Sequence, residues 1–206
     1  MHIPSSESQK LEIEPFADAL LRSGRSGAYD AGHWIYVPDY YTEYRYVLGT
    51  KGKRPLICIG INPSTAEPDN LDNTLKSVSR IADANGFDSW IMFNVYAQRA
   101  TRPDDMDLNC NEELHRENMA AFSYIVREAA KENSTPMIWA AWGAIIEKRA
   151  YLADCVRDMI EIGKQYAAEW VCAGKCSVKG HPHHPLYLKK NELIHEFPVE
   201  EYLKLL

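Results

Sequence analysis

Short apolar runs alternate with longer amphipathic stretches along this chain. Each run has the length and the β-branched or aromatic content of a buried strand, and the runs lie at residues 55–61, 90–97, 136–143 and 168–176. The amphipathic stretches repeat apolar residues at helical spacing, and they lie at residues 72–86, 111–133 and 144–164. The last of these stretches, residues 144–164, is expected to form a helix that is either continuous or interrupted by a bend. A strand–helix alternation of this kind predicts parallel βαβ units, with helices on both faces of one sheet.

The two ends of the chain depart from this alternation. Residues 1–28 are predicted to form an irregular or partly helical arm, and a short helix is predicted within residues 189–206. Residues 33–50, HWIYVPDYYTEYRYVLGT, are rich in tyrosine and interrupted by Pro38, which predicts two short strands in a hairpin or at a sheet edge. The aromatic side chains of this segment fit either a surface on which bases stack or the packing of an edge strand.

The predicted fold class is therefore α/β. We expect a three-layer α/β/α sandwich with a four-stranded parallel core sheet and a peripheral N-terminal hairpin. No internal repeat, low-complexity stretch or linker interrupts the pattern, so residues 1–206 are expected to form a single domain. Within it, residues 1–50 supply the arm and the hairpin, and residues 54–190 supply the core.

Composition narrows the class of protein. Of the 206 residues, 46% are hydrophobic and 25% are charged, which is ordinary for a soluble globular protein. No apolar run approaches the roughly 18–20 residues that span a bilayer, and the polar, acidic N-terminus lacks the features of a secretory signal. The odd number of cysteines, five, fits a reducing compartment. We therefore expect a cytoplasmic protein with no membrane partner, whose oligomeric state stays open.

Charge is distributed unevenly along the chain. The formal net charge of −6 counts against DNA as a partner, because nucleic-acid-binding proteins are usually basic. Positive residues nevertheless gather close to the ends of the predicted strands, where they are Lys51, Lys53, Arg54, Arg99, Arg102, Lys175, Lys179, Lys189 and Lys190. This distribution fits either a face that attracts phosphate groups or an ordinary solvated basic face.

Polar residues follow the predicted strands at the points where these end. The carboxyl ends of parallel strands meet at one edge of a sheet, where ligands bind in α/β proteins. We therefore predict a ligand pocket formed by Gly60, Asn62, Pro63, Ser64, Asn94, Arg99, Trp142, Lys179, His181, His183, His184 and Leu186. The dinucleotide-binding, P-loop and serine-hydrolase motifs are all absent from the sequence, which argues against those chemistries.

The motifs GINPS, WIMFNVYAQRAT, MIWAAWGAIIEK and GHPHHPLYL, in this order, resemble the uracil-DNA glycosylase superfamily over roughly residues 54–190. INPSTA, RAT and GHPHHPLYL resemble more closely a bacterial and phage family known as a domain of unknown function. The first resemblance implies a glycosylase-like fold in which Asn62 holds the hydrolytic water and Asn94 reads the base. It also implies that His181 donates a hydrogen bond to the departing base and that Leu186 is the nearest equivalent of the duplex-inserting wedge.

Three departures from the superfamily pattern qualify this picture. Position 62 has Asn, as in the mismatch-specific branch, where other members have Asp, and an amide is a poor base. Ser64 replaces Tyr or Gly, which changes the pocket floor, and the last loop is one residue longer than His-Pro-Ser-Pro-Leu. Each residue also has a plainer explanation, because Asn before Pro is a common turn residue and a buried Asn or a loop His often has a purely structural role.

The leading hypothesis is a nucleobase-recognising N-glycosidic hydrolase, similar to DNA glycosylases, that acts on a deaminated or modified base in DNA. The alternatives are a hydrolase of a free nucleoside or nucleotide, and a non-catalytic nucleotide- or nucleic-acid-binding module of the same fold. No cofactor and no metal are expected. Zinc on Cys172, Cys176 and the neighbouring histidines competes with simple core packing of the thiols, and an iron–sulfur cluster lacks the required cysteine spacing.

Overall fold

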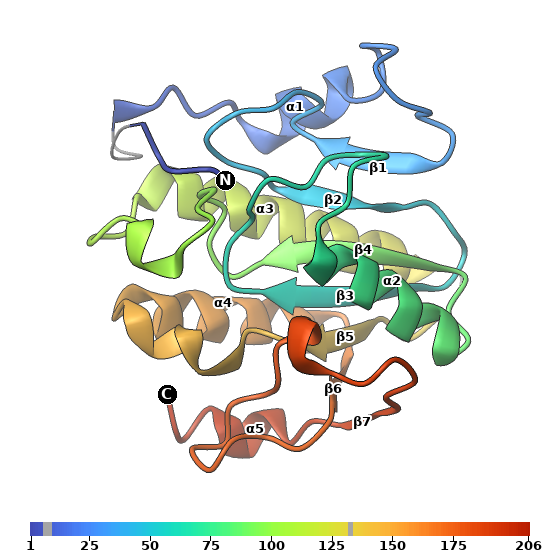
Figure 1. Cartoon of the computed structure of the whole chain (residues 1–206), viewed down its shortest axis with the longest axis vertical. Coiled ribbons are helices and arrows are strands. Elements are labelled where there is room, and N and C mark those ends of the chain that lie inside the picture. Colours follow the sequence, from blue (N-terminus) through green and yellow to red (C-terminus); the bar gives the residue numbers. More distant parts are fainter. Residues whose placement is uncertain (6–9, 132–133) are drawn as a thin grey trace.

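One mixed β-sheet runs through the molecule, with helices on both sides (Figure 1). The computed structural model describes residues 1–5, 10–131 and 134–206. Within these residues the sheet has seven strands in the order β1-β2-β4-β3-β5-β6-β7. The fold is therefore a mixed α/β fold, as the alternation of strands and helices predicts.

The central strands pair in parallel. β3 (Pro55–Gly60) lies between β4 (Ser89–Asn94) and β5 (Met137–Ala140), and β5 pairs with β6 (Glu169–Ala173). All six residues of β4 are buried, as expected for a strand that is covered on both faces.

The outer strands run antiparallel to their neighbours. β1 (Trp34–Val37) and β2 (Val47–Thr50) form the expected hairpin, and β2 joins it to β4. On the other side β7 (Ile194–Glu196) pairs with β6. β7 is missing from the sequence-based prediction, because a three-residue strand with two exposed polar residues has no recognisable alternation.

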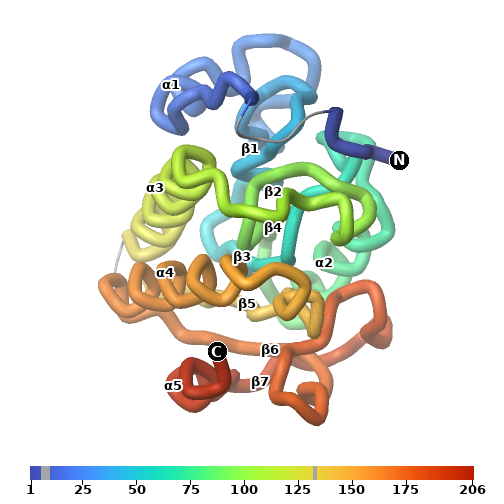
Figure 2. The backbone as a smooth tube through the Cα atoms, turned by 90° about the vertical axis from the view of Figure 1, so that its left-hand side faces the viewer, coloured from blue at the N-terminus to red at the C-terminus, as the bar shows by residue number. Residues whose placement is uncertain are grey.

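Helices cover the two faces of the sheet. α3 (Glu112–Ala129) and α4 (Tyr151–Gln165) pack against each other on one face, and α2 (Asn73–Ala84) lies on the other (Figure 2). Two short helices, α1 (Phe16–Arg22) and α5 (Val199–Tyr202), lie close to the chain ends. None of the helices in the described ranges is long and apolar enough to cross a membrane.

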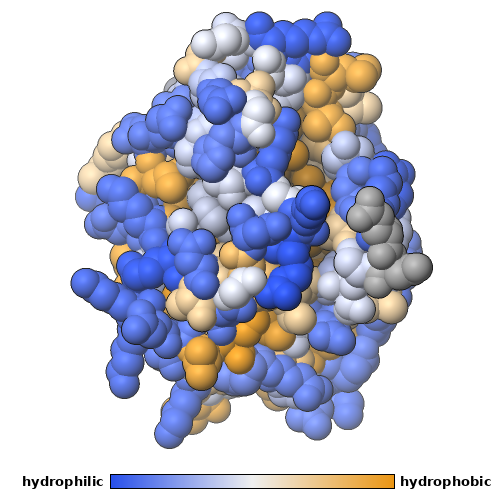
Figure 3. All heavy atoms as spheres, turned by 90° about the vertical axis from the view of Figure 1, so that its right-hand side faces the viewer, coloured by the Kyte–Doolittle hydropathy of each residue, from blue (hydrophilic) through white to orange (hydrophobic). Residues whose placement is uncertain are grey.

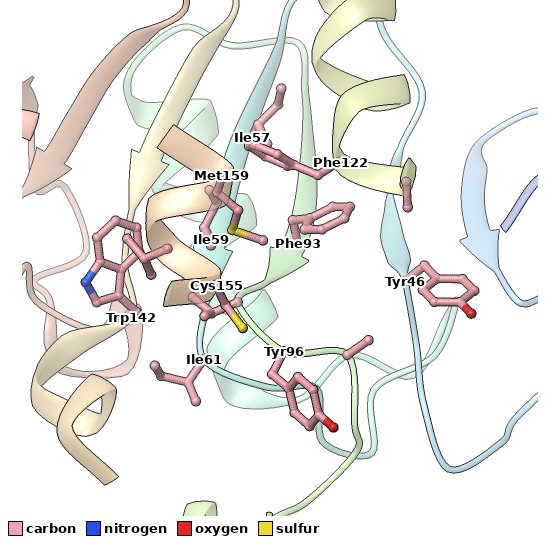
Figure 4. Packing of buried hydrophobic residues seen from close by; sticks show 14 of the residues in the cluster. Tyr46, Ile57, Ile59, Ile61, Phe93, Tyr96, Phe122, Trp142, Cys155 and Met159 are labelled. Atoms are coloured by element: carbon pink, nitrogen blue, oxygen red, sulfur yellow. The ribbon is translucent and has the colours of Figure 1, made fainter. Parts of the chain in front are cut away.

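Each face of the sheet has its own apolar cluster. On the α3 and α4 side, Phe93 packs on Phe122 with ring centroids 5.1 Å apart, beside Met159 (Figure 4). On the α2 side, Val78 and Trp139 belong to the second cluster. In contrast, the surface at the amino ends of β3 and β4 is mostly hydrophilic with scattered apolar patches (Figure 3).

Side-chain caps explain where two of the helices begin. The Asp72 carboxylate accepts a hydrogen bond from the Leu75 N–H at 2.9 Å and starts α2. The Asn111 side chain likewise accepts from the N–H groups of Glu113 and Leu114, both at 3.0 Å, and starts α3. Both residues are favoured caps because they satisfy N–H groups that lack partners inside a helix.

Two predicted helices differ from the observed ones. Residues 144–164 divide into a 3-10 helix, Gly143–Lys148, and α4, which begins at Tyr151. The predicted helix is therefore interrupted and not continuous. The helix expected at residues 111–133 ends at Ala129, and residues 132–133 lie outside the described part of the chain.

A matched pair of leucine substitutions tests this description of the core. Leu114 in α3 is fully buried, whereas Leu108 is 80% exposed. We expect Leu114→Ala to lower the free energy of unfolding by about 2–5 kcal/mol, because it leaves a cavity. Leu108→Ala is expected to change it by less than about 0.5 kcal/mol. Urea denaturation of both variants measures the two changes, and equal losses would contradict the packing described here.

Candidate functional site

A pocket of about 440 Å³ opens where β3 and β4 end. Its walls come from the turn after β3, the first turn of α2 and the loop after β6. Of the residues predicted from the sequence, seven line this pocket, namely Gly60, Asn62, Pro63, Ser64, Asn94, His184 and Leu186. The pocket lies at the carboxyl ends of neighbouring parallel strands, which is the edge of the sheet where the sequence predicts a ligand pocket.

Asn94 forms the buried floor of the pocket. Its side chain is 1% exposed, and its Oδ1 accepts a hydrogen bond from Arg45 Nη2 at 3.3 Å. Its Nδ2 has no hydrogen-bond partner among the described residues. An unsatisfied buried donor costs about 1–3 kcal/mol, so the unpaired N–H group of Asn94 is unfavourable in the protein alone.

Gly60 makes room for the Asn94 amide. The two residues are partners in the parallel register of β3 and β4. A Cβ atom at position 60 would lie 3.2 Å from Asn94 Nδ2 and only 2.5 Å from Met92 Cε. Glycine at this position therefore lets the amide lie against the strand end.

Asn62 is held by one half of its amide. Its Nδ2 donates to the carbonyl oxygens of Pro63 and Ala100, at 3.0 and 2.7 Å. Its Oδ1 accepts no hydrogen bond from the described part of the chain, and the residue lines the pocket. The residue thus combines the plain role of a turn residue with an oriented acceptor that can hold a water molecule.

His184 and Asp72 form the opposite wall. Burial lowers the pKa of His184, and the nearby Asp72 carboxylate only partly opposes this change, so the imidazole is neutral near pH 7. His184 Nδ1 accepts a long hydrogen bond, 3.4 Å, from the Leu186 N–H, which assigns the proton to Nε2. Asp72 has the one carboxylate among the described lining residues, and one of its oxygens caps α2.

Arg45 reaches the pocket from the segment before β2. It is 1% exposed, and its Nη1 donates to the Ala66 carbonyl at 3.1 Å, while its Nε has no partner among the residues described. Burial, together with the charge of Arg99, lowers the pKa of Arg45, although the guanidinium stays charged at neutral pH.

Arg99 lies behind the pocket and does not line it. It is fully buried, donates to the Ser64 and Ala66 carbonyls and to the Tyr36 hydroxyl, and stacks on the Tyr41 ring. Its contribution to the site is therefore structural and electrostatic.

The structure places His181 away from Asn62 and Asn94, contrary to the expectation that the three face one cavity. It is 5% exposed, with Nδ1 2.9 Å from the Tyr202 hydroxyl and Nε2 2.9 Å from Glu147 Oε1. It lines a second pocket, of about 540 Å³. The loop after β6 continues beyond it, and His184 is the residue of this loop that reaches the main pocket.

The remaining predicted residues also lie outside the main pocket. Trp142 is fully buried and donates from Nε1 to the Tyr202 hydroxyl at 2.9 Å. Lys179 pairs with Glu147 at 2.8 Å, and His183 is exposed. The pairing of Lys179 neutralises part of the basic segment that the sequence suggests as a phosphate-attracting face.

Cys172 and Cys176 are neighbours, but the histidines of the cluster do not join them at one point within the described residues. Cys172 Sγ contacts the His195 ring at 3.6 Å, whereas His181 and His184 line different pockets. Over the described ranges, no three side chains of the metal-binding types come together.

Two charged residues that line the pocket, Arg45 and Asp72, were not among the residues predicted from the sequence. Arg45 lies between two tyrosines in the segment predicted to form a hairpin or a sheet edge, and no role was predicted for it. A charge flanked by large aromatic residues was the available signal. Asp72 is the first residue of the predicted helical stretch 72–86; it caps α2, and it also lines the pocket.

Two Asn→Asp substitutions test the hydrogen bonding at the end of β4. Asn94→Asp gives Arg45 an anionic partner and removes the unpaired N–H groups, so we expect the free energy of unfolding to rise by about 1 kcal/mol. Asn118 is equally buried, but its Nδ2 donates to the Asn94 and Val95 carbonyls. Asn118→Asp should cost about 3–5 kcal/mol, because it leaves a buried charge facing carbonyl oxygens.

Thermal or urea unfolding near pH 7 measures both changes. A loss of stability in both variants would show that Asn94 is satisfied by the protein itself.

Comparison with known proteins identifies the family. A family model described as "Protein of unknown function (DUF1643)" matches residues 45–186, which is more than half of the chain and includes every residue that lines the main pocket except Tyr187. No curated protein sequence and no solved structure matches the chain. The resemblance to uracil-DNA glycosylases therefore stays a prediction, while the expected relationship to a domain of unknown function is confirmed. This chain belongs to the DUF1643 family.

Proposed function

We propose that this protein is an N-glycosidic hydrolase that recognises a nucleobase in the main pocket, in the manner of a DNA glycosylase. The observation that carries the proposal is that two amide side chains, of Asn62 and Asn94, line the same pocket. Asn94 offers a buried, unsatisfied N–H donor, and Asn62 offers a fixed oxygen acceptor. A donor for the base and an acceptor for the attacking water are the two groups that this reaction needs at close range.

Asn94 would read the edge of the base. Its Nδ2 would donate to a ring carbonyl, and its Oδ1, already shared with Arg45, would accept from a neighbouring ring N–H. Such paired hydrogen bonds favour bases with adjacent carbonyl and N–H groups, as in uracil and hypoxanthine, which are products of deamination.

Cleavage transfers the base to the solvent and a hydroxyl group to the sugar. The bond between C1′ and the base nitrogen breaks with its electron pair going to the base, and the oxygen of water bonds to C1′. Asn62 Oδ1 orients that water, and Asp72 accepts its proton, directly or through a second water molecule. The Asp72 assignment compensates for the weakness of an amide as a base.

His184 takes the role that the resemblance assigns to His181. A neutral imidazole with its proton on Nε2 is a donor aimed at negative charge that develops on the base. Exposed Leu186 and Tyr187 at the rim of the pocket supply apolar contacts for the rest of a DNA strand or nucleotide.

A second candidate function is hydrolysis of a free nucleoside or nucleotide. The net charge of −6 and the Lys179–Glu147 ion pair favour it, because they weaken the attraction of the surface for a polyanion. Asn62, with Nδ2 bound to two carbonyls, also fits a binding module without catalysis.

Base release from oligonucleotides that contain uracil, hypoxanthine or other modified bases tests the proposal. Abasic sites are cleaved and quantified under single-turnover conditions. We expect Asn62→Ala and His184→Ala each to lower the rate by about 100-fold or more. His183→Ala is the matched control, since this exposed neighbour lies outside the pocket and should leave the rate unchanged.

Release from free nucleosides or nucleotides alone would favour the second candidate. Release from neither substrate class would refute the hydrolase and leave the binding module.

The pH profile tests the assignment of His184. Because its neutral form is the required donor and burial lowers its pKa, the rate should be full above the ordinary imidazole pKa of about 6.5 and fall as pH drops through the lowered value. His184→Gln retains an N–H donor that does not titrate in this range. Its profile should lack this decline, and an unchanged decline would assign the titration to another group.

A further inference from the structure

Two guanidinium groups are buried beneath Asn94 without an anionic partner. Arg45 and Arg99 are 1% and 0% exposed, and both donate to the same Ala66 carbonyl. Their other partners are uncharged oxygens, of Ser64, Tyr36 and Asn94. Neither one forms an ion pair with a carboxylate in the parts of the chain that are described.

This arrangement is unfavourable in the protein alone. Removing a cation from water costs several kcal/mol unless a counter-charge is supplied, and two adjacent cations repel each other. Asp72 acts on Arg45 only through space, since the first-turn cap already engages one of its oxygens. Three unsatisfied donors add to this positive field among the described residues, namely the Nε atoms of Arg45 and Arg99 and the Nδ2 atom of Asn94.

A bound group that compensates this positive charge fits best beside the Asn94 amide. Arg45 both lines the pocket and bonds to Asn94, so a group hydrogen-bonded to the amide lies over the guanidinium. The N-terminus of α2 is a poorer place for it, because Asp72 already supplies a carboxylate there. A planar ring that spreads its charge over carbonyl oxygens matches the neighbouring N–H donors of Arg45 and Asn94.

We propose that Arg45, with Arg99 behind it, makes this pocket selective for a nucleobase in its anionic form. The inference rests on the proposed function for the identity of the ring, and it gives the cationic pair a role in binding the departing base, which leaves as an anion. Neutral bases of the same shape bind more weakly, because they leave the buried charge uncompensated.

Isothermal titration with matched free bases tests the inference. Barbiturate and uracil share a pyrimidine ring, but barbiturate is an anion at neutral pH, and urate and hypoxanthine form a corresponding purine pair. We expect wild type to bind the anion of at least one pair about tenfold or more tightly than its neutral counterpart. Affinities within about twofold in both pairs would overturn the inference, whatever happens to the variants.

Three variants assign the preference to Arg45. Arg45→Met should bring the affinity ratio close to one, whereas Arg45→Lys, which keeps the charge, should retain most of it. Arg102→Met is the matched control, because it removes an exposed positive charge and should leave the ratio unchanged. A ratio that survives in Arg45→Met, or that falls equally in the control, would overturn the assignment.

A stability measurement separates this role from a structural one. Without ligand, Arg45→Met should melt at or above the temperature of wild type, since an apolar side chain replaces an unpaired buried charge. A lower melting temperature with an unchanged affinity ratio would show that Arg45 only supports the fold. Base release is assayed in parallel, so that a preference for anions without hydrolysis refutes only the proposed function, and hydrolysis without the preference refutes only this inference.

Discussion

The parallel register of β3 and β4, which sets Gly60 beside Asn94, is the constraint on which the pocket depends. It brings an amide to the carboxyl end of one strand and a residue without a side chain to the end of the next, so the amide has room above the sheet. The turn at Pro63 places Asn62 at the same opening. The Asn62 Nδ2 atom donates a hydrogen bond to the Ala100 carbonyl, which follows β4. The Asn62 amide is thereby held by backbone carbonyls, and Asn94 is placed by its position at the end of a central strand, a rigid element of the fold.

The antiparallel hairpin adds the electrostatic part of the site. The segment before β2 continues alongside the residues that follow β4, where the Arg45 N–H donates to the Ala97 carbonyl at 3.0 Å. This pairing brings a buried cation to the pocket floor at a cost to stability that the surrounding carbonyls only partly offset. Strained or unsatisfied polar groups of this kind are concentrated at functional sites in many proteins.

The C-terminal helix is joined to the sheet by a separate polar network. The Tyr202 hydroxyl receives the Trp142 Nε1–H and contacts His181 Nδ1, and His181 Nε2 reaches Glu147. Three segments that are far apart in the sequence are linked in this way, so His181 has a structural explanation independent of catalysis. His184, three positions further along the chain, does not take part in this network, and it lines the main pocket.

The sequence by itself determined the alternation of strands and helices, the strand pair near the N-terminus and the edge of the sheet where polar residues gather. These features follow from periodicity and from local hydrogen bonding, which short stretches encode without reference to the rest of the chain. The short strand β7 was not predicted, because its antiparallel pairing with β6 makes it a strand and its local sequence pattern does not.

Which side chains share the pocket was decided only by the tertiary structure. His181 and His184 are three positions apart and equally plausible in the sequence, yet Tyr202 and Glu147 hold one of them elsewhere. Arg45 lines the pocket because its segment pairs with the residues after β4, and Asp72 lines it because α2 begins there. No sequence motif encodes either arrangement. The direction of a side chain and the identity of its partners depend on contacts between distant segments, and those contacts exist only in the folded chain.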